Sequence, residues 1–86
     1  MNGYRVDVAR AARRELQRLP ASVVQRIIAA LRELENDPRP RGSLKLEDKE
    51  TTYRIRVGRY RIIYDIVDRS RSVLVTRIRH RKDAYQ

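Results

Sequence analysis

The chain has 86 residues, enough for one small domain with a modest core, and we interpret residues 1–86 as a single domain. With 21 Lys and Arg against 11 Asp and Glu its net charge is +10, which is typical of a protein that binds nucleic acid or an acidic protein partner. The absence of cysteine and the single histidine exclude a disulfide framework and a thiolate or histidine-rich metal site, and we expect no metal and no cofactor.

The N-terminal segment has no apolar stretch of signal-peptide length, and no run approaches the roughly 18 apolar residues of a membrane span. We therefore expect a cytoplasmic protein without membrane contact. Within this segment Tyr4, Val6 and Val8 alternate with charged residues, which predicts a half-buried strand over residues 3–8.

Two amphipathic helices are predicted next. The first carries an apolar stripe at helical spacing, made up of Ala9, Ala12, Leu16 and Leu19. Pro20 ends this helix and can serve as the first residue of the second, which we predict over residues 20–36. Pro38 stops the second helix, because the residue before a proline is pushed out of the helical conformation. Each helix is expected to pack one face on a sheet.

The second half of the chain reads as strands. After a connector rich in proline and glycine, Leu44 and Leu46 are expected to start or flank a sheet. Further strands are predicted over residues 51–57, 60–68 and 73–79. The second of these carries apolar residues on both faces, which favours a central position. The predicted fold class is α+β: an N-terminal strand, a helical hairpin, then a three- to four-stranded antiparallel sheet.

The segment TTYRIRVGRYRIIY places arginines on one face of a hairpin. Gly58 and Arg59 are predicted to form a two-residue type II′ turn, with glycine in its first position. This turn sets Arg56 opposite Arg61, with Arg54 on the same face. Like charges directly opposite each other destabilise a strand pair by a few tenths to about 1 kcal/mol. Because Arg is suited to bidentate contacts with phosphate, the cluster predicts an anion-binding site.

The order of elements, the hairpin sequence YRIRVGRYRIIYDI and the C-terminal sequence RIRHRKDAY together resemble the RelE/ParE superfamily of toxins from type II toxin–antitoxin systems, over essentially the whole chain. The combination of an arginine after the turn with a C-terminal His-Arg…Tyr is closer to RelE-type toxins. That resemblance implies a ribosome-dependent, metal-independent endoribonuclease, an mRNA interferase that cuts mRNA in the A site and inhibits translation. ParE-type toxins share the fold, lack the ribonuclease centre and inhibit DNA gyrase, which is the alternative function.

The resemblance implies a cleft built from Arg54, Arg56, Arg61, Arg81 and Tyr85. The first two stand where the best-known member of the family has lysines. Since a guanidinium cannot act as a general base at neutral pH, a proton-abstracting role does not transfer to them, whereas electrostatic clamping does. The implied reaction is attack of a ribose 2′-OH on its own phosphate. Arg61 and Arg81 are the candidates for stabilising the charge of its transition state.

Further candidates come from the last strand and the residues that follow it. His80 is the only side chain whose ordinary pKa, about 6.5, suits proton transfer in the cell. Its alternation with its arginine neighbours leaves open that it faces away from the cleft. Tyr85 could donate a proton, bind phosphate or stack on a base, or it could pack on the helices. Arg77, Arg79 and Lys82 are predicted, with Arg54 and Arg56, to bind substrate.

Either toxin interpretation implies the same kind of partner, an antitoxin with an acidic, amphipathic tail that covers the basic surface in a hetero-oligomeric complex. The RelE interpretation adds the 70S ribosome and mRNA. A small basic RNA-binding module without toxicity remains a third hypothesis. The helix arginines are either solvated or dock on ribosomal RNA; these are Arg10, Arg13, Arg14 and Arg18.

Overall fold

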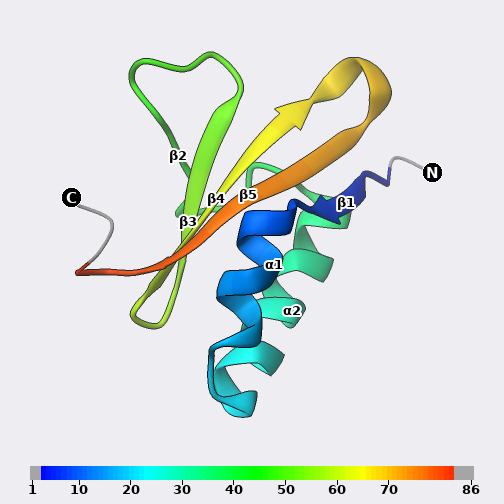
Figure 1. Cartoon of the computed structure of the whole chain (residues 1–86). Helices are drawn as coiled ribbons and strands as arrows, with labels where there is room; N and C mark the ends of the chain where they lie inside the picture. Colours follow the sequence, from blue (N-terminus) through cyan, green and yellow to red (C-terminus); the bar gives the residue numbers. More distant parts are fainter. Residues whose placement is uncertain (1–2, 83–86) are drawn as a thin grey trace.

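A computed structural model describes residues 3–82 of the chain (Figure 1). Its elements are, in chain order, β1 (Arg5–Val8), α1 (Arg10–Gln17), α2 (Ala21–Asn36), β2 (Leu44–Lys45), β3 (Thr52–Val57), β4 (Tyr60–Val67), the single-turn helix η1 (Asp68–Ser70) and β5 (Ser72–His80). They match the predicted elements in type and order. Neither α-helix in this part of the chain is long and apolar enough to cross a membrane.

The strands form one sheet in the order β1-β5-β4-β3-β2, with β4 in the middle as its apolar residues on both faces predict. The α+β class is confirmed, but the sheet is five-stranded and mixed. The difference lies in β1, which joins the edge of β5 in parallel and pairs Arg5 to Val8 with Ser72 to Val75. The two helices follow β1 in the chain, and the meander of β3, β4 and β5 comes after them. The first strand of the chain therefore pairs with the last one, at one edge of the sheet.

Both helices contribute to the core on one face of the sheet, where Ala12 of α1 and Ile27 and Leu34 of α2 have no exposed surface. From the sheet the core takes Ile55, Ile62, Tyr64, Ile66, Val73, Val75 and Ile78. In Figure 1 the two helices lie side by side and project beyond the sheet, near the end that carries the turn between β3 and β4. Among residues 3–82, no helix lies over the opposite face of β3, β4 and β5.

A proline lies close to each end of α2. Pro20 lies just before the first residue of α2 with extended backbone, while α1 ends earlier, at Gln17. The backbone N–H groups of Arg18 and Leu19 donate to the carbonyls of Glu15 and Leu16, which closes α1 with a tightened turn. Asp37, before Pro38, is extended and ends α2, as the steric effect of a following proline predicts.

The hairpin of β3 and β4 has the predicted register. Val57 pairs with Tyr60, Arg56 with Arg61, and Arg54 with Ile63. Gly58 has φ +58 and Arg59 is not among the described non-glycine residues with positive φ, which is the pattern of a type II′ turn. A side chain at Gly58 would also meet the guanidinium of Arg26, whose Nη1 atom lies 3.3 Å from where a Cβ would sit. The positive φ favours glycine here, and the Arg26 side chain would have to move slightly to admit any other residue.

The connector after α2 is fastened to the sheet by polar contacts. Arg39 binds Asp68 through both Nη atoms, at 3.1 and 2.8 Å, and donates from Nε to the Tyr53 hydroxyl. Tyr4 donates to the same Asp68 carboxylate at 2.7 Å. The Tyr64 hydroxyl donates to the Pro38 carbonyl, and burial raises the pKa of Tyr64 to about 12. These bonds hold the connector where it can support β2 at the edge of β3.

Candidate functional site

Five arginines lie on the face of the sheet opposite α1 and α2, and we call this set the arginine face: Arg54, Arg56, Arg61, Arg77 and Arg79. Successive side chains of a strand point to opposite faces. Because Ile55, Ile62 and Ile78 enter the core, their neighbours in the strands point the other way. The register then aligns Arg56, Arg61 and Arg79 in one row across β3, β4 and β5, and Arg54, Ile63 and Arg77 in the next.

A β-bulge makes this arrangement possible in β5. The pairing shifts between Ile63, which faces Arg77, and Tyr64, which faces Val75, so Thr76 is the extra residue. Its hydroxyl donates to the Ile63 carbonyl at 3.2 Å. In a regular strand with strict alternation, Arg77 would share a face with Val75 and point into the core. The bulge therefore turns the arginines of β5 onto the open face.

Arg61 occupies the centre of the row and is the only charged residue that is buried in the described part of the chain, with 6% of its surface exposed. Its position on the middle strand, between Arg56 and Arg79, explains the burial. Because water has little access to a buried cation, it stabilises that cation less than an exposed one and screens its attraction for an anion less. The Arg61 guanidinium is thus suited to bind a phosphate that enters from the open face.

Glu15 of α1 reaches two of the arginines across the edge of β5. Its Oε2 atom lies 3.6 Å from Arg77 Nη1 and 3.4 Å from Arg79 Nε, and its Oε1 atom accepts the backbone N–H of Ile78 at 2.8 Å. Arg54 and Arg56 form no ion pair with any residue from 3 to 82. Glu15 is not among the site residues predicted from the sequence. It is the one acidic residue of α1, and that is the signal by which it could have been found.

Arg81 joins the cluster at the turn. Its backbone N–H donates to the Arg59 carbonyl at 2.7 Å, and its side chain lines a hollow of about 40 Å³ together with Arg56 and Arg61. The chain therefore brings together Arg54, Arg56, Arg61, Arg77, Arg79 and Arg81 of the predicted site. Lys82 is exposed. Tyr85 lies outside the described residues.

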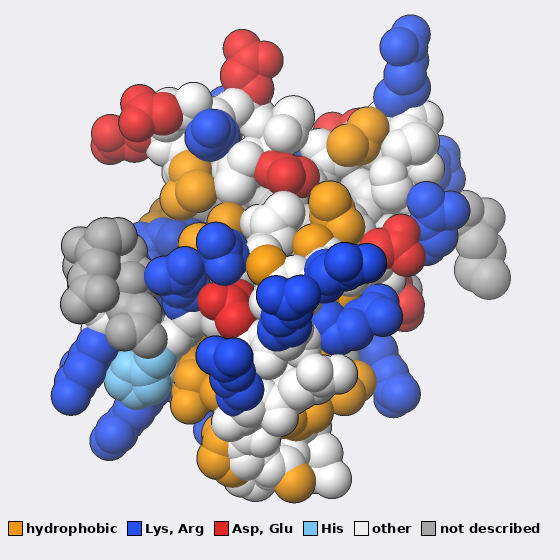
Figure 2. Space-filling model, in the orientation of Figure 1, with side chains coloured by type: hydrophobic (Ala, Val, Ile, Leu, Met, Phe, Trp, Pro, Cys, Tyr) orange, Lys and Arg blue, Asp and Glu red, His pale blue; other side chains and the backbone are white. Residues whose placement is uncertain are grey.

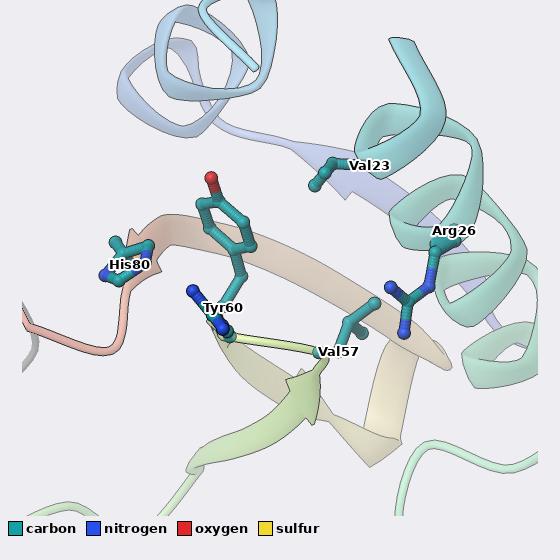
Figure 3. A pocket seen from close by; sticks show the side chains of 7 residues that line it. Val23, Arg26, Val57, Tyr60 and His80 are labelled. Atoms are coloured by element: carbon teal, nitrogen blue, oxygen red, sulfur yellow. The ribbon is translucent and has the colours of Figure 1, made fainter. Parts of the chain in front are cut away.

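His80 lies on the other side of the sheet. It pairs with Tyr60, whose ring meets the imidazole edge-to-face with centroids 5.2 Å apart, and its Nδ1 accepts the backbone N–H of Lys82 at 3.2 Å. Figure 3 shows both side chains at the rim of a cavity between the turn and α2. The His80 side chain, whose direction the sequence left open, therefore points to the helix side of the sheet, away from the arginine face.

Basic side chains extend well beyond the arginine face. The four arginines that the sequence placed on the first helix are exposed: Arg10, Arg13, Arg14 and Arg18. Figure 2 shows Lys and Arg side chains crowded around α1, with few acidic groups between them. Among residues 3–82 there is no cluster of His, Asp and Glu that could hold a metal ion. Fold and surface together define a small basic α+β domain with a cluster of arginines on one face of its sheet.

Comparison with known proteins places this domain in a family. Residues 6–85 match the sequence model of the family described as the ParE toxin of the type II toxin–antitoxin system parDE. Toxin RelG of Mycobacterium tuberculosis is 31% identical over 84 residues, which cover 96% of this chain and 97% of that toxin. The chain belongs to the RelE/ParE toxin superfamily of type II toxin–antitoxin systems.

Solved structures agree in fold over almost the whole chain. The archaeal RelE–RelB complex from Pyrococcus horikoshii OT3 contains a chain with a TM-score of 0.83 and 30% identity, covering 92% of this chain and 96% of that one. The toxin–antitoxin complex RelBE2 from Mycobacterium tuberculosis gives a TM-score of 0.79 and 32% identity, with 92% and 99% covered. Both relatives were solved with an antitoxin, which supports a cognate antitoxin as a partner of this chain.

Proposed function

We propose that this toxin is a ribosome-dependent endoribonuclease that cuts mRNA in the A site without a metal ion. The observation that carries the proposal is the row of Arg56, Arg61 and Arg79 across three strands, with Arg81 beside it at the turn. Like charges in adjacent strands weaken the sheet, so a site that keeps them is suited to an anion. A phosphodiester is the anion that the superfamily relationship favours.

In the proposed reaction the 2′-OH of a ribose attacks the adjacent phosphate, a 2′,3′-cyclic phosphate forms and the 5′-oxygen leaves. Arg61 and Arg81 stabilise the charge that develops on the phosphorane-like transition state, an effect of about 3–4 kcal/mol for one well-placed donor. Arg54 and Arg56, which carry no internal ion pair in the described chain, hold the flanking phosphates, with Arg77, Arg79 and Lys82 extending this track.

Proton transfer requires a different group, because arginine stays charged at neutral pH. Tyr85 is the candidate donor to the leaving oxygen. His80 is the other candidate, and its place on the helix side of the sheet means that it would have to act from beyond the turn. On this proposal most of the rate enhancement comes from fixed cations and from the orientation of mRNA by the 70S ribosome in the cytoplasm.

The test is expression of the chain in growing bacteria, with primer extension on cellular mRNA. We expect growth arrest, loss of protein synthesis and breaks in phase with codons. Arg61→Ala combined with Arg81→Ala should abolish the breaks, while Arg32→Ala, an exposed arginine on α2, should leave them unchanged. Full toxicity and unchanged breaks in the folded double variant would refute the proposal.

Inhibition of DNA gyrase is the second candidate, favoured by the family description, which names the ParE toxin. The basic surface would then contact gyrase or DNA, and the same cells should show a DNA damage response with intact mRNA. Primer extension therefore separates the two functions in one experiment.

A further inference from the structure

A second concave site lies on the helix side of the turn, opposite the arginine face, and we call it the turn cavity. Its volume is about 450 Å³. It is lined by Val23, Arg26, Val57, Gly58, Arg59, Tyr60 and His80. The proposed ribonuclease reaction uses only His80 among these, and only as a candidate. The cavity thus needs an explanation of its own.

The cavity combines an apolar floor with cations at its rim. Val23 of α2 and Val57 of β3 pack only partly against the core, so each keeps an accessible apolar surface. Figure 3 shows Val23 and Val57 on either side of the opening, with the Arg26 guanidinium directed from α2 toward the turn. Arg26 and Arg59 are both exposed, and neither forms an ion pair with a residue from 3 to 82.

The Arg26 guanidinium lies close to the turn, 3.3 Å from where a Cβ of residue 58 would sit, and the absence of a side chain at Gly58 leaves room for it. A cation so close to a valine floor favours a ligand that carries an apolar group and a negative charge a few ångströms apart. An acidic, amphipathic protein segment has this chemistry, with an apolar side chain flanked by carboxylates.

A nucleotide fits the cavity less well. Two aliphatic side chains, Val23 and Val57, offer no hydrogen bonds to a base edge. The Tyr60 ring already meets His80 edge-to-face, and the His80 Nδ1 already accepts the Lys82 N–H, so a base that stacked here would have to rearrange this pair of rings. Of the two classes of ligand, the observations favour the peptide.

We propose that the turn cavity anchors the antitoxin, taking one apolar side chain of its acidic segment against Val23 and Val57 while neighbouring carboxylates bind Arg26 and Arg59. This inference rests on the cognate antitoxin that the toxin family and its solved complexes support, and it goes further by assigning the anchor to the face opposite the arginines. The toxin then carries two surfaces on the two sides of one hairpin, one for the antitoxin and one for the phosphodiester. They meet at the turn, where Gly58, Arg59 and Tyr60 line both, whereas Val23 and Arg26 belong to the turn cavity alone.

The test measures the affinity between the full-length toxin and the separately purified protein encoded by the open reading frame next to the toxin gene, by isothermal titration calorimetry. Arg26→Glu should weaken binding about tenfold or more, since it replaces an attraction by a repulsion. Arg32→Glu is the matched control, because it is exposed on the same helix and changes the net charge equally. It should change the dissociation constant by less than about threefold.

A second variant tests the apolar floor. Val23→Phe fills the cavity from the helix side without changing the charge, and it should also weaken binding about tenfold. Circular dichroism melting checks that each variant is folded, and mRNA cleavage should be retained in all three. Retained cleavage with lost antitoxin affinity is the result that supports the anchor.

Three results would overturn it. Equal weakening by Arg26→Glu and Arg32→Glu would mean that only net charge matters, and unchanged affinity in Arg26→Glu and Val23→Phe would exclude the cavity from the interface. Loss of mRNA cleavage with intact antitoxin affinity would identify the cavity as an RNA contact. The proposed ribonuclease function fails separately, through absent cleavage by the wild-type toxin, and the affinity measurements do not depend on it.

Discussion

Glu15 is the residue that limits how much positive charge the open face presents. Its carboxylate lies within 3.6 Å of Arg77 and Arg79, yet both contacts are longer than an ideal charged hydrogen bond. The same side chain also satisfies the Ile78 N–H, which β1 leaves unpaired because it ends opposite Val75. Glu15 therefore has two separable roles, an electrostatic one on the arginines and a structural one on the strand edge.

Glu15→Gln separates these roles, since it removes the charge and keeps an oxygen that can accept the Ile78 N–H. We expect affinity for a fluorescein-labelled single-stranded RNA to rise about threefold to tenfold, because Arg77 and Arg79 are released toward phosphate. The free energy of unfolding should change by less than about 1 kcal/mol. Fluorescence anisotropy and denaturant unfolding measure the two quantities.

Glu15→Leu is the companion variant, because it also removes the acceptor. It should destabilise the fold by about 1–3 kcal/mol, the cost of an unsatisfied buried N–H group. Unchanged RNA affinity in Glu15→Gln, or equal stability of the two variants, would show that Glu15 does not play the role assigned to it.

At the scale of the elements, the hairpin and β5 show what the sequence can and cannot predict. A two-residue turn leaves only one register, so the pairing of Arg56 with Arg61 follows from Gly58 alone. In β5 the segment from Val73 to Arg79 changes phase, because the buried residues are Val73 and Val75 before Thr76 and Ile78 after it. Strict alternation would have placed Arg77 in the core, and only the pairing with β4 reveals the bulge.

Long-range pairing is the other part that local patterns do not contain. Nothing in residues 3–8 indicates which strand they join, so the parallel contact of β1 with β5 could not be predicted. The burial of Arg61 has the same origin, because it depends on the neighbours that both adjacent strands bring. The resemblance to the toxin superfamily supplied the candidate residues, whereas their rows across the sheet come from the register.

Asp68 is the acidic residue that binds Arg39 of the connector between α2 and β2, and this gives the fold a pH dependence. Hydrogen bonds from Arg39, and then from Tyr4, lower the pKa of Asp68 below its ordinary value. A carboxylate whose pKa is lower in the folded state stabilises the fold above its unfolded pKa of about 3.9, and this stabilisation is lost as the pH falls through the folded pKa.

Asp68→Asn should therefore lower the melting temperature at pH 7, and the difference from the wild type should shrink as the pH falls below about 4. Thermal unfolding followed by circular dichroism, at several values from about pH 2 to about pH 7, measures this difference in melting temperature. Asp48→Asn is the control, an exposed acid without an ion pair in the described chain, and it should leave the curve unchanged. A constant difference between wild type and Asp68→Asn across the whole range would contradict the assignment.

At the scale of the whole molecule, the net charge of +10 is spread over more than one surface. The arginine face lies on one side of the sheet, while the arginines of α1 lie on the helix side, where Figure 2 shows basic side chains close together. A ligand as large as a ribosome could contact both at once, since the domain measures only 33 × 27 × 25 Å. The α1 arginines are then either part of the docking surface or simply solvated.

The salt dependence of ribosome binding distinguishes these two roles. Each phosphate contact that is lost should lower the slope of log affinity against log salt concentration by about 0.7–0.9. The test variant replaces four arginines of α1 and its C-terminal end with glutamine, which preserves helix propensity: Arg10, Arg13, Arg14 and Arg18. The control variant replaces four other exposed cations with glutamine and so has the same net charge: Arg32, Lys45, Lys49 and Arg69.

If α1 docks on ribosomal RNA, the slope measured by cosedimentation with 70S ribosomes should fall by about 2 or more in the α1 variant and by less than about 1 in the control. Equal slopes in the two variants would mean that α1 contributes only to the overall field, since the two proteins differ in where the charge was removed and not in how much. The arginine face would then account for the specific phosphate contacts by itself, and Arg54 and Arg56, which no internal acid in the described chain neutralises, would be the residues whose loss changes the slope.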